Sequence, residues 1–118
     1  MRERTFSCPV DAAISVFGGK YKAVILWHLM TTGTLRYSEI RRRVPATDKM
    51  LAQQLRELEA DGLVSRTVYP VVPPKTEYSL TDSGATLAPI LDAVCEWGKG
   101  WISAHGIAVP AEINRKTG

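Results

Sequence analysis

The most informative stretch of this 118-residue sequence reads Thr47-Asp48-Lys49-Met50-Leu51-Ala52-Gln53-Gln54-Leu55-Arg56-Glu57-Leu58-Glu59-Ala60-Asp61-Gly62. Its leucines recur at helical spacing, which is typical of a helix with one buried side. They are Leu51, Leu55 and Leu58. Thr47 is suited to cap the start of this helix, and Gly62 to stop it in the left-handed conformation. We therefore expect a helix from Thr47 to about Ala60.

A second, shorter helix is expected just before this one. Residues 38–44 fill one or two helical turns, with Ile40 and Val44 pointing inward. Pro45 ends that piece because a proline disfavours helical geometry at the preceding residue. Two helices joined by a tight turn predict a helix-turn-helix over about residues 38–61.

The residues that follow predict a β-hairpin. Residues 63–69 and 76–80 are rich in alternating and β-branched side chains, and a proline-rich stretch, residues 70–75, joins them. A hairpin directly after a helix-turn-helix indicates the winged form of that motif, with the wing over about residues 63–80.

Helices are also expected on both sides of this unit. The segment after Cys8 has helical apolar spacing and stops at Gly18-Gly19, and residues 20–30 are apolar on most sides. Residues 34–36 are long enough only for a strand fragment. A last long helix is expected over about 82–103, with a kink near Pro89. The fold class is mainly α with a small β-hairpin (α+β), and residues 1–118 are expected to form one domain.

Composition limits the function classes. The sequence has no apolar run of about 18 residues and no signal-peptide pattern at Met1-Arg2-Glu3-Arg4, so we expect a cytoplasmic protein without a membrane span. Cys8 and Cys95 lack a metal-ligand companion, so neither a disulfide scaffold nor a metal site is expected. No catalytic set or phosphate loop can be assembled, so we expect no enzyme and no cofactor.

The basic residues are concentrated in the middle of the chain. Residues 20–56 hold eight Lys and Arg against two acids, a charge of +6, whereas the whole chain carries +3 and the remainder therefore −3. This asymmetry is typical of a protein with one face that meets a polyanion.

The polar side of the expected second helix suits DNA recognition. Gln53 can pair bidentately with adenine, Lys49 can reach guanine acceptors or a phosphate, and Ala52 leaves room for a thymine methyl group. Arg41, Arg42 and Arg43 would contact phosphates without reading sequence, and Arg66, Tyr69 and Lys75 would reach the DNA from the hairpin. The candidate DNA-binding residues are Lys20, Lys22, Ser38, Arg41, Arg42, Arg43, Thr47, Asp48, Lys49, Ala52, Gln53, Arg56, Arg66 and Lys75.

The segment from Cys8 to Trp97 resembles the HxlR-type family of bacterial winged helix-turn-helix regulators, which is related to the MarR group. The motifs that carry the resemblance are Cys8-Pro9-Val10, Gly18-Gly19-Lys20-Tyr21-Lys22 (where the family more often has tryptophan than Tyr21), Leu35-Arg36-Tyr37-Ser38-Glu39-Ile40, the run from Lys49 to Val64, and Tyr69-Pro70 through Val72-Pro73-Pro74 to Glu77-Tyr78-Ser79-Leu80-Thr81.

The resemblance implies a transcriptional regulator that binds a palindromic operator in double-stranded DNA as a homodimer. It places the dimer contacts on the first and last helices. The last helix also has more large apolar residues than one small domain readily covers. The candidate interface residues are Val10, Ile14, Leu91, Val94, Trp97 and Trp101.

Cys8 is a candidate redox sensor. Several members of the family sense oxidants or electrophiles through a cysteine at the corresponding position. Pro9 suits the first helical position, which places Cys8 at the N-cap, where the helix dipole favours a thiolate. Asp11, three residues on, would oppose the thiolate.

Two alternatives stay open at this point. A small apolar effector bound between the halves of the dimer could control the regulator in place of thiol chemistry, whereas a small electrophile would act through Cys8. A winged helix used only for protein contacts would bind duplex DNA weakly and without the steep salt dependence of an operator binder.

Overall fold

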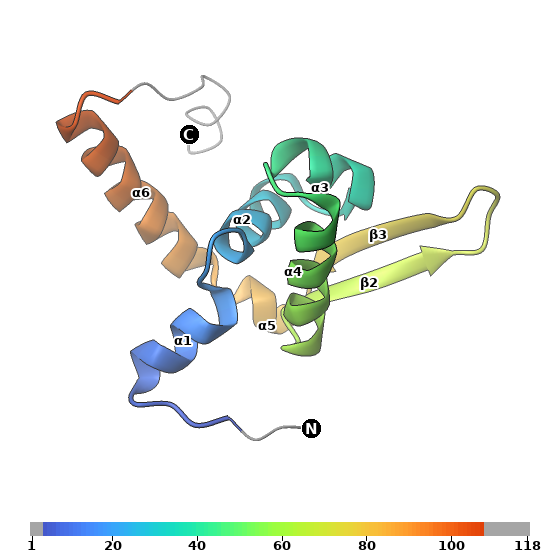
Figure 1. The fold of residues 1–118 in the computed structure, drawn as a ribbon, viewed down its shortest axis with the longest axis horizontal. Coiled ribbons are helices and arrows are strands. Elements are labelled where there is room, and N and C mark those ends of the chain that lie inside the picture. The colour runs from blue at the N-terminus through green and yellow to red at the C-terminus, as the bar shows by residue number, and fades with distance from the viewer. Residues whose placement is uncertain (1–3, 108–118) are drawn as a thin grey trace. The chain divides into compact units, whose positions relative to one another are not determined.

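The computed structural model describes residues 4–107 (Figure 1). Its contacts divide the chain into two compact units, Met1–Ala85 and Thr86–Gly118, so the single domain over residues 1–118 stays a prediction. Within the described range, no helix has the length and apolar character needed to cross a membrane. The same range contains no group of three or more His, Cys, Asp or Glu side chains that could hold a metal ion.

The first unit is mainly helical with a small antiparallel sheet, which confirms the predicted fold class. Its elements are α1 (Pro9–Phe17), α2 (Lys22–Thr32), β1 (Leu35–Arg36), α3 (Tyr37–Arg43), α4 (Asp48–Ala60), β2 (Val64–Tyr69), β3 (Lys75–Leu80) and α5 (Asp82–Ala85). The helix-turn-helix is formed by α3 and α4, and the wing by β2 and β3.

The core of this unit is aliphatic. Side chains from α2, α3 and its C-cap residue, α4 and β2 are almost completely removed from solvent, and burying each contributes about 1.5–3 kcal/mol. The largest of them are Ile25, Leu26, Ile40, Val44, Leu51, Leu55, Leu58 and Val64. Because α4 supplies three of these residues, its orientation about its own axis is set by the core.

The sheet has three strands in the order β1-β3-β2, all antiparallel. The hairpin register pairs Val64 with Leu80 and Tyr69 with Lys75, while β1 pairs Leu35 with Tyr78. Figure 1 shows the hairpin extending well past α3 and α4. The sequence predicted β1 only as a strand fragment, so its pairing with β3 is new.

Both ends of α4 follow the predicted signals. The N–H of Met50 donates to Oγ1 of Thr47 (3.1 Å), which makes Thr47 the N-cap. Gly62 adopts φ +78°, a left-handed conformation that glycine adopts without steric cost. The Thr81 hydroxyl donates to the carbonyl oxygen of Gly62 (2.6 Å), so the end of α4 is joined to the start of α5.

The second unit contains α6 (Ala88–Ala104). The long helix predicted over 82–103 is therefore two helices, because α5 ends at Ala85 and the chain turns at Thr86 and Leu87. Pro89 is the second residue of α6, where its missing N–H and fixed φ are tolerated. The proline thus marks the start of a helix and not the predicted kink within one.

Candidate nucleic-acid interface

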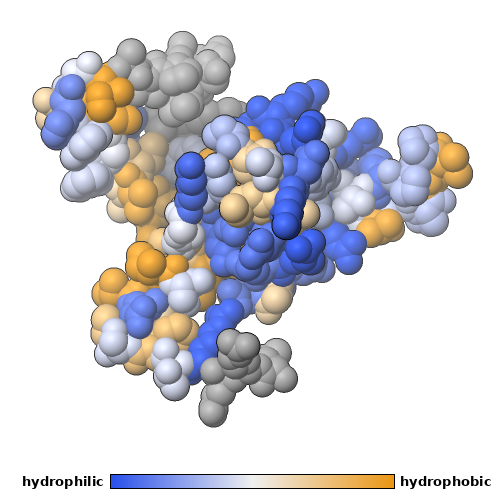
Figure 2. Space-filling model, viewed as in Figure 1, coloured by the Kyte–Doolittle hydropathy of each residue, from blue (hydrophilic) through white to orange (hydrophobic). Residues whose placement is uncertain are grey.

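The two sides of α4 differ sharply in exposure. Its three leucines are fully buried, whereas Lys49, Gln53 and Arg56 are exposed and Ala52 is half-buried. Figure 2 shows hydrophilic side chains gathered over α3 and α4. The structure thus presents the predicted residues of α4 together on its outer side. Short and fork-shaped polar side chains on an exposed helix are what reading a major groove requires.

The N-terminus of α4 is tied to α3. Arg41 forms an ion pair with the carboxylate of Asp48, and the Tyr37 hydroxyl lies 3.3 Å from the Asp48 carbonyl oxygen. The pair is exposed on both sides, so its contribution to stability is small. The ion pair has a local effect, because Asp48 offsets the charge of Arg41 at the N-terminus of α4, the end that would meet DNA.

The three arginines at the end of α3 lie in different surroundings. Arg43 is half-buried, and its Nη1 donates to the carbonyl oxygen of Glu39 (3.0 Å). Arg42 is exposed and forms no ion pair with any of residues 4–107. Ser38, near the start of α3, is also exposed. Among the arginines, Arg42 is therefore the one best placed to reach a phosphate.

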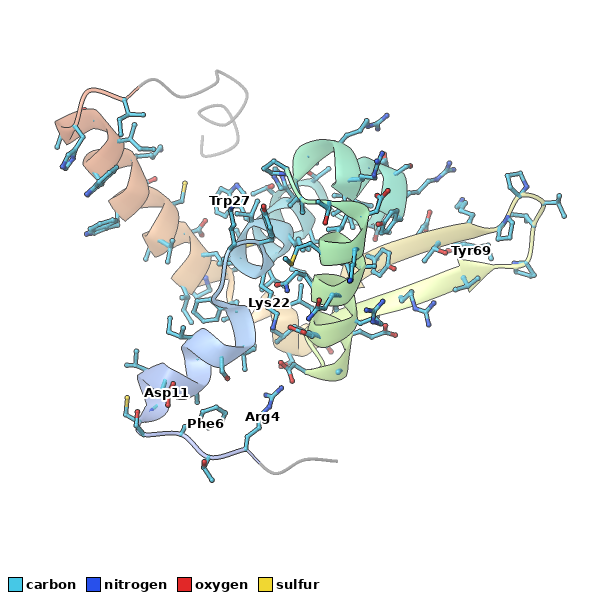
Figure 3. All side chains as sticks on the ribbon, viewed as in Figure 1. Arg4, Phe6, Asp11, Lys22, Trp27 and Tyr69 are labelled. Carbon is cyan, nitrogen blue, oxygen red and sulfur yellow. The ribbon has the colours of Figure 1, made fainter. Side chains whose placement is uncertain are left out.

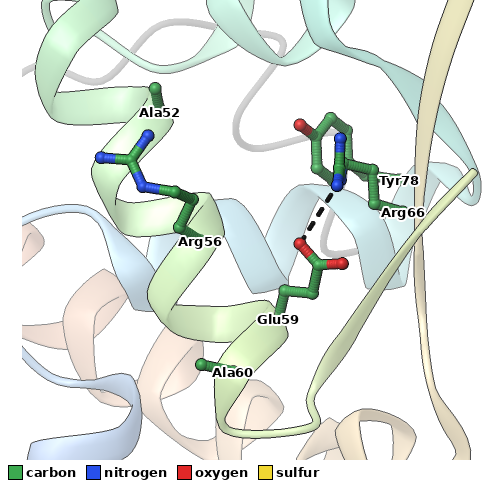
Figure 4. A pocket seen from close by; sticks show the side chains of 6 residues that line it. All are labelled: Ala52, Arg56, Glu59, Ala60, Arg66 and Tyr78. Atoms are coloured by element: carbon green, nitrogen blue, oxygen red, sulfur yellow. Dashed lines mark ion pairs between the residues drawn. The ribbon is translucent and has the colours of Figure 1, made fainter. Parts of the chain in front are cut away.

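A hollow separates α4 from the wing (Figure 4). It is lined by Ala52, Arg56, Glu59, Ala60, Arg66 and Tyr78. Nε of Arg66 lies 3.5 Å from Oε1 of Glu59, so the wing arginine is held against α4. The sequence indicates Arg56 and Arg66 as separate candidates. It does not show that they line one hollow, because the contact joins a helix to a strand.

Near the tip of the wing, Lys75 is partly neutralised. Its Nζ lies 4.9 Å from the ring centroid of Tyr69 and 3.5 Å from Oε2 of Glu77. The Tyr69 hydroxyl donates to Oε1 of Glu77 (3.1 Å), which raises the pKa of Tyr69. The two predicted wing residues thus form one cluster with an acid.

The two lysines near the start of α2 have opposite surroundings. Lys20 is exposed, with its Nζ 5.5 Å from the ring centroid of Tyr21. Lys22 is only 9% exposed, and its Nζ lies 2.7 Å from Oε1 of Glu57 on α4. Figure 3 shows Lys22 beside α4. A buried, paired ammonium is not available to a phosphate, so we leave Lys22 out of the interface that the sequence had suggested.

Cys8 is the N-cap residue of α1 and is exposed. The backbone N–H of Asp11, with smaller contributions from the Ser7 side chain and the backbone of Val10, lowers the pKa of the Cys8 thiol. The Asp11 carboxylate accepts from the backbone N–H and the hydroxyl of Ser7 (2.9 and 3.2 Å). The opposition expected from Asp11 is therefore outweighed. Cys95, in contrast, is half-buried, and burial raises its pKa.

Apolar side chains are exposed on α1 and on α6 (Figure 2). On α1, Val10 is 68% exposed and Ile14 is also exposed. On α6, the exposed side chains recur at helical spacing and include Trp97 at 71%; they are Ile90, Val94, Trp97 and Trp101. Leu91 is only 3% exposed, so this predicted interface residue is already buried within the chain.

Comparison with known proteins identifies relatives over most of the chain. Residues 16–106 match the model of the family described as HxlR-like helix-turn-helix. An uncharacterized HTH-type transcriptional regulator of Methanothermobacter thermautotrophicus is 51% identical over 100 residues, covering 84% of this chain and 76% of the relative. The uncharacterized regulator YtcD of Bacillus subtilis is 51% identical over 104 residues, covering 87% and 82%.

Solved structures agree with this comparison. The redox regulator HypR in its oxidized form superposes with a TM-score of 0.74 at 52% identity, covering 79% of this chain and 96% of HypR. Its reduced form gives a TM-score of 0.75 at 51% identity, covering 79% and 92%. The two sequence relatives are thus described as HTH-type transcriptional regulators, and HypR as a redox regulator.

Proposed function

Because this chain belongs to the HxlR-like helix-turn-helix family of transcriptional regulators, we propose that it binds a palindromic operator in double-stranded DNA as a homodimer. The helix α4 enters the major groove, and the wing contacts the neighbouring backbone. Gln53, Lys49 and Ala52 face the bases. The other contacts, which hold the register, come from Lys20, Ser38, Arg42, Arg56, Arg66 and Lys75.

One observation carries this proposal: the leucines of α4 are fully buried while its polar residues are exposed on the opposite side. The core therefore prevents the helix from turning its polar side inward. The capped N-terminus at Thr47 adds free backbone N–H groups near the expected phosphates.

Selection of bound sites from a random duplex pool tests the proposal. We expect enrichment of an inverted repeat whose half-sites lie about one helical turn, roughly 34 Å, apart. Affinity for the selected site should fall steeply with salt. A purified protein that enriches no sequence at low ionic strength would contradict operator binding and favour a winged helix used only for protein contacts.

The exposed apolar side chains support the dimer. A tryptophan exposed to 71% on a helix with further exposed apolar residues is unusual for a monomer. We assign the contact surface to Val10 and Ile14 of α1 and to Val94, Trp97 and Trp101 of α6. Sedimentation of Trp97→Lys against Glu96→Lys, a matched change at the neighbouring exposed position, tests this surface. Only the tryptophan variant should become monomeric.

Thiol oxidation of Cys8 is the regulatory step that we include in the proposal. Its exposure and lowered pKa favour the thiolate, which is the reactive form, and the similar protein HypR is described as a redox regulator. With diamide as oxidant, two thiols form one S–S bond, and their two electrons and two protons reduce the N=N bond.

Operator affinity before and after diamide tests the switch in wild type, Cys8→Ser and Cys95→Ser. The oxidant should weaken or strengthen binding of the wild type and leave Cys8→Ser unchanged. Equal effects on wild type and Cys8→Ser would remove Cys8 as the sensor. The Cys95→Ser variant shows whether the second thiol is Cys95 or a cysteine of another copy.

A further inference from the structure

Three side chains form a continuous polar chain from the start of α2 to the outer side of α4. Nζ of Lys22 donates to Oε1 of Glu57 (2.7 Å), and Nε2 of Gln53 donates to Oε2 of the same carboxylate (3.1 Å). Each oxygen of Glu57 thus has its own partner. This network of hydrogen bonds links the buried ammonium of Lys22 to the exposed amide of Gln53, which we place against the bases.

The inner end of this network, at Lys22, is buried. Lys22 is 9% exposed, and a buried ammonium requires a charged or strongly polar partner. The Lys22 and Gln53 hydrogen bonds both lower the pKa of Glu57, so the carboxylate is ionised at neutral pH. An ionised carboxylate only accepts hydrogen bonds. Lys22 of α2 therefore holds one oxygen of Glu57, and the other oxygen is the acceptor for Gln53 on the outer side of α4.

The acceptor decides which way the Gln53 amide is turned. Only the NH₂ end of the amide can donate to Glu57, so the Oε1 end is directed elsewhere. One N–H is used by Glu57, which leaves one N–H and the carbonyl oxygen. These are the two groups that a glutamine uses toward N7 and N6 of adenine.

We propose that Lys22 and Glu57 are positioning residues that turn the Gln53 amide for adenine. The inference rests on the proposed function, since it assigns a preference at one position of each half-site. Lys22 and Glu57 touch no DNA in this arrangement. Without them, the amide can rotate by half a turn and offer donors and acceptor in the opposite order.

Glu57→Gln tests the inference, because a glutamine at 57 offers both a donor and an acceptor to Gln53. The matched control is Glu59→Gln, which removes the same charge from the same helix but belongs to the pair with Arg66. Both variants remove one negative charge and should raise general DNA affinity. Only Glu57→Gln should lower the preference for adenine at the Gln53 position, by about fivefold or more.

The operator position that Gln53 reads is identified first. In Gln53→Ala, the base preference should be lost at one base pair per half-site. If the wild type selects no sequence, the proposed function fails and this inference with it. If the wild type selects an operator but Gln53→Ala changes no position, or if folded Glu57→Gln keeps the adenine preference, only the inference is overturned. Should Glu57→Gln not fold, the double variant Lys22→Met/Glu57→Gln removes both charges together. A lowered adenine preference in the double variant then supports the inference, and an unchanged preference overturns it.

Discussion

Arg4 and Asp61, 57 residues apart in the sequence, form an ion pair in which Nη2 of Arg4 donates to Oδ1 of Asp61 at 2.7 Å. Asp61 is the C-cap residue of α4, and its side chain is only 10% exposed. The segment that carries Cys8 is thereby attached to the end of the helix proposed to read DNA. Oδ2 of Asp61 is buried and has no hydrogen-bond partner among residues 4–107.

Arg4→Met should therefore destabilise the protein. It leaves the buried carboxylate of Asp61 without its cation, although the 53% exposure of Arg4 weakens the pair. We expect the free energy of unfolding to fall by about 1–2 kcal/mol in urea titrations. Arg4→Met/Asp61→Asn, which removes both charges, should recover part of the loss. Wild-type stability of Arg4→Met would show that the pair contributes nothing.

Thr47→Ala should cost about 1 kcal/mol of stability, because the Met50 N–H loses its acceptor at the N-cap of α4. Thr47→Ser keeps a hydroxyl at that place and serves as the control. Thermal unfolding followed by circular dichroism compares the two variants. If alanine and serine unfold at the same temperature, the cap does not stabilise α4.

Arg42→Ala should weaken binding to all duplexes to a similar extent. Arg42 is exposed and unpaired among the described residues, so it would contact a phosphate and read no base. The slope of log affinity against log salt should become shallower by about 1. Arg43→Ala is the matched control, because its guanidinium is held by Glu39. A slope unchanged in Arg42→Ala would exclude the phosphate contact.

The contribution of Glu57 to stability should depend on pH. Hydrogen bonds from Lys22 and then Gln53 lower its pKa in the folded protein below the ordinary value of 4.5. The stabilisation is thus fully present above about pH 4.5 and is lost as the pH falls through the lowered pKa. The difference in unfolding free energy between wild type and Glu57→Gln should be constant near pH 7 and shrink below pH 4.5. A difference independent of pH down to about 2 would contradict the ion pair with Lys22.

Cys8 should be alkylated faster than Cys95 at neutral pH. Its pKa is lowered and its thiol is exposed, while burial raises the pKa of Cys95. Iodoacetamide labelling followed by peptide mass spectrometry gives both rates in one sample, and the Cys8 rate should reach its plateau at the lower pH. Equal rates for the two cysteines would contradict the effect of the Asp11 N–H on Cys8.

Local sequence determined much of this protein. The extent of α4, its cap at Thr47, its stop at Gly62 and the hairpin follow from signals within a few residues of each place. Apolar periodicity also placed the leucines of α4 inside, and with them the polar side outside. These features depend on neighbours along one helix or strand, so a reader of the sequence can find them.

Tertiary structure decided what depends on residues distant in the chain. The pairing of Leu35 with Tyr78, the burial of Lys22 against Glu57 and the pair of Arg4 with Asp61 each join segments more than 30 residues apart. From the sequence alone, Lys22 is expected to be a solvated cation. Only the packing of α2 against α4 gives it a carboxylate partner. The physical reason is that ion pairs and strand pairs form between residues that are close in space. The separation of two residues along the sequence does not show whether they are close in space.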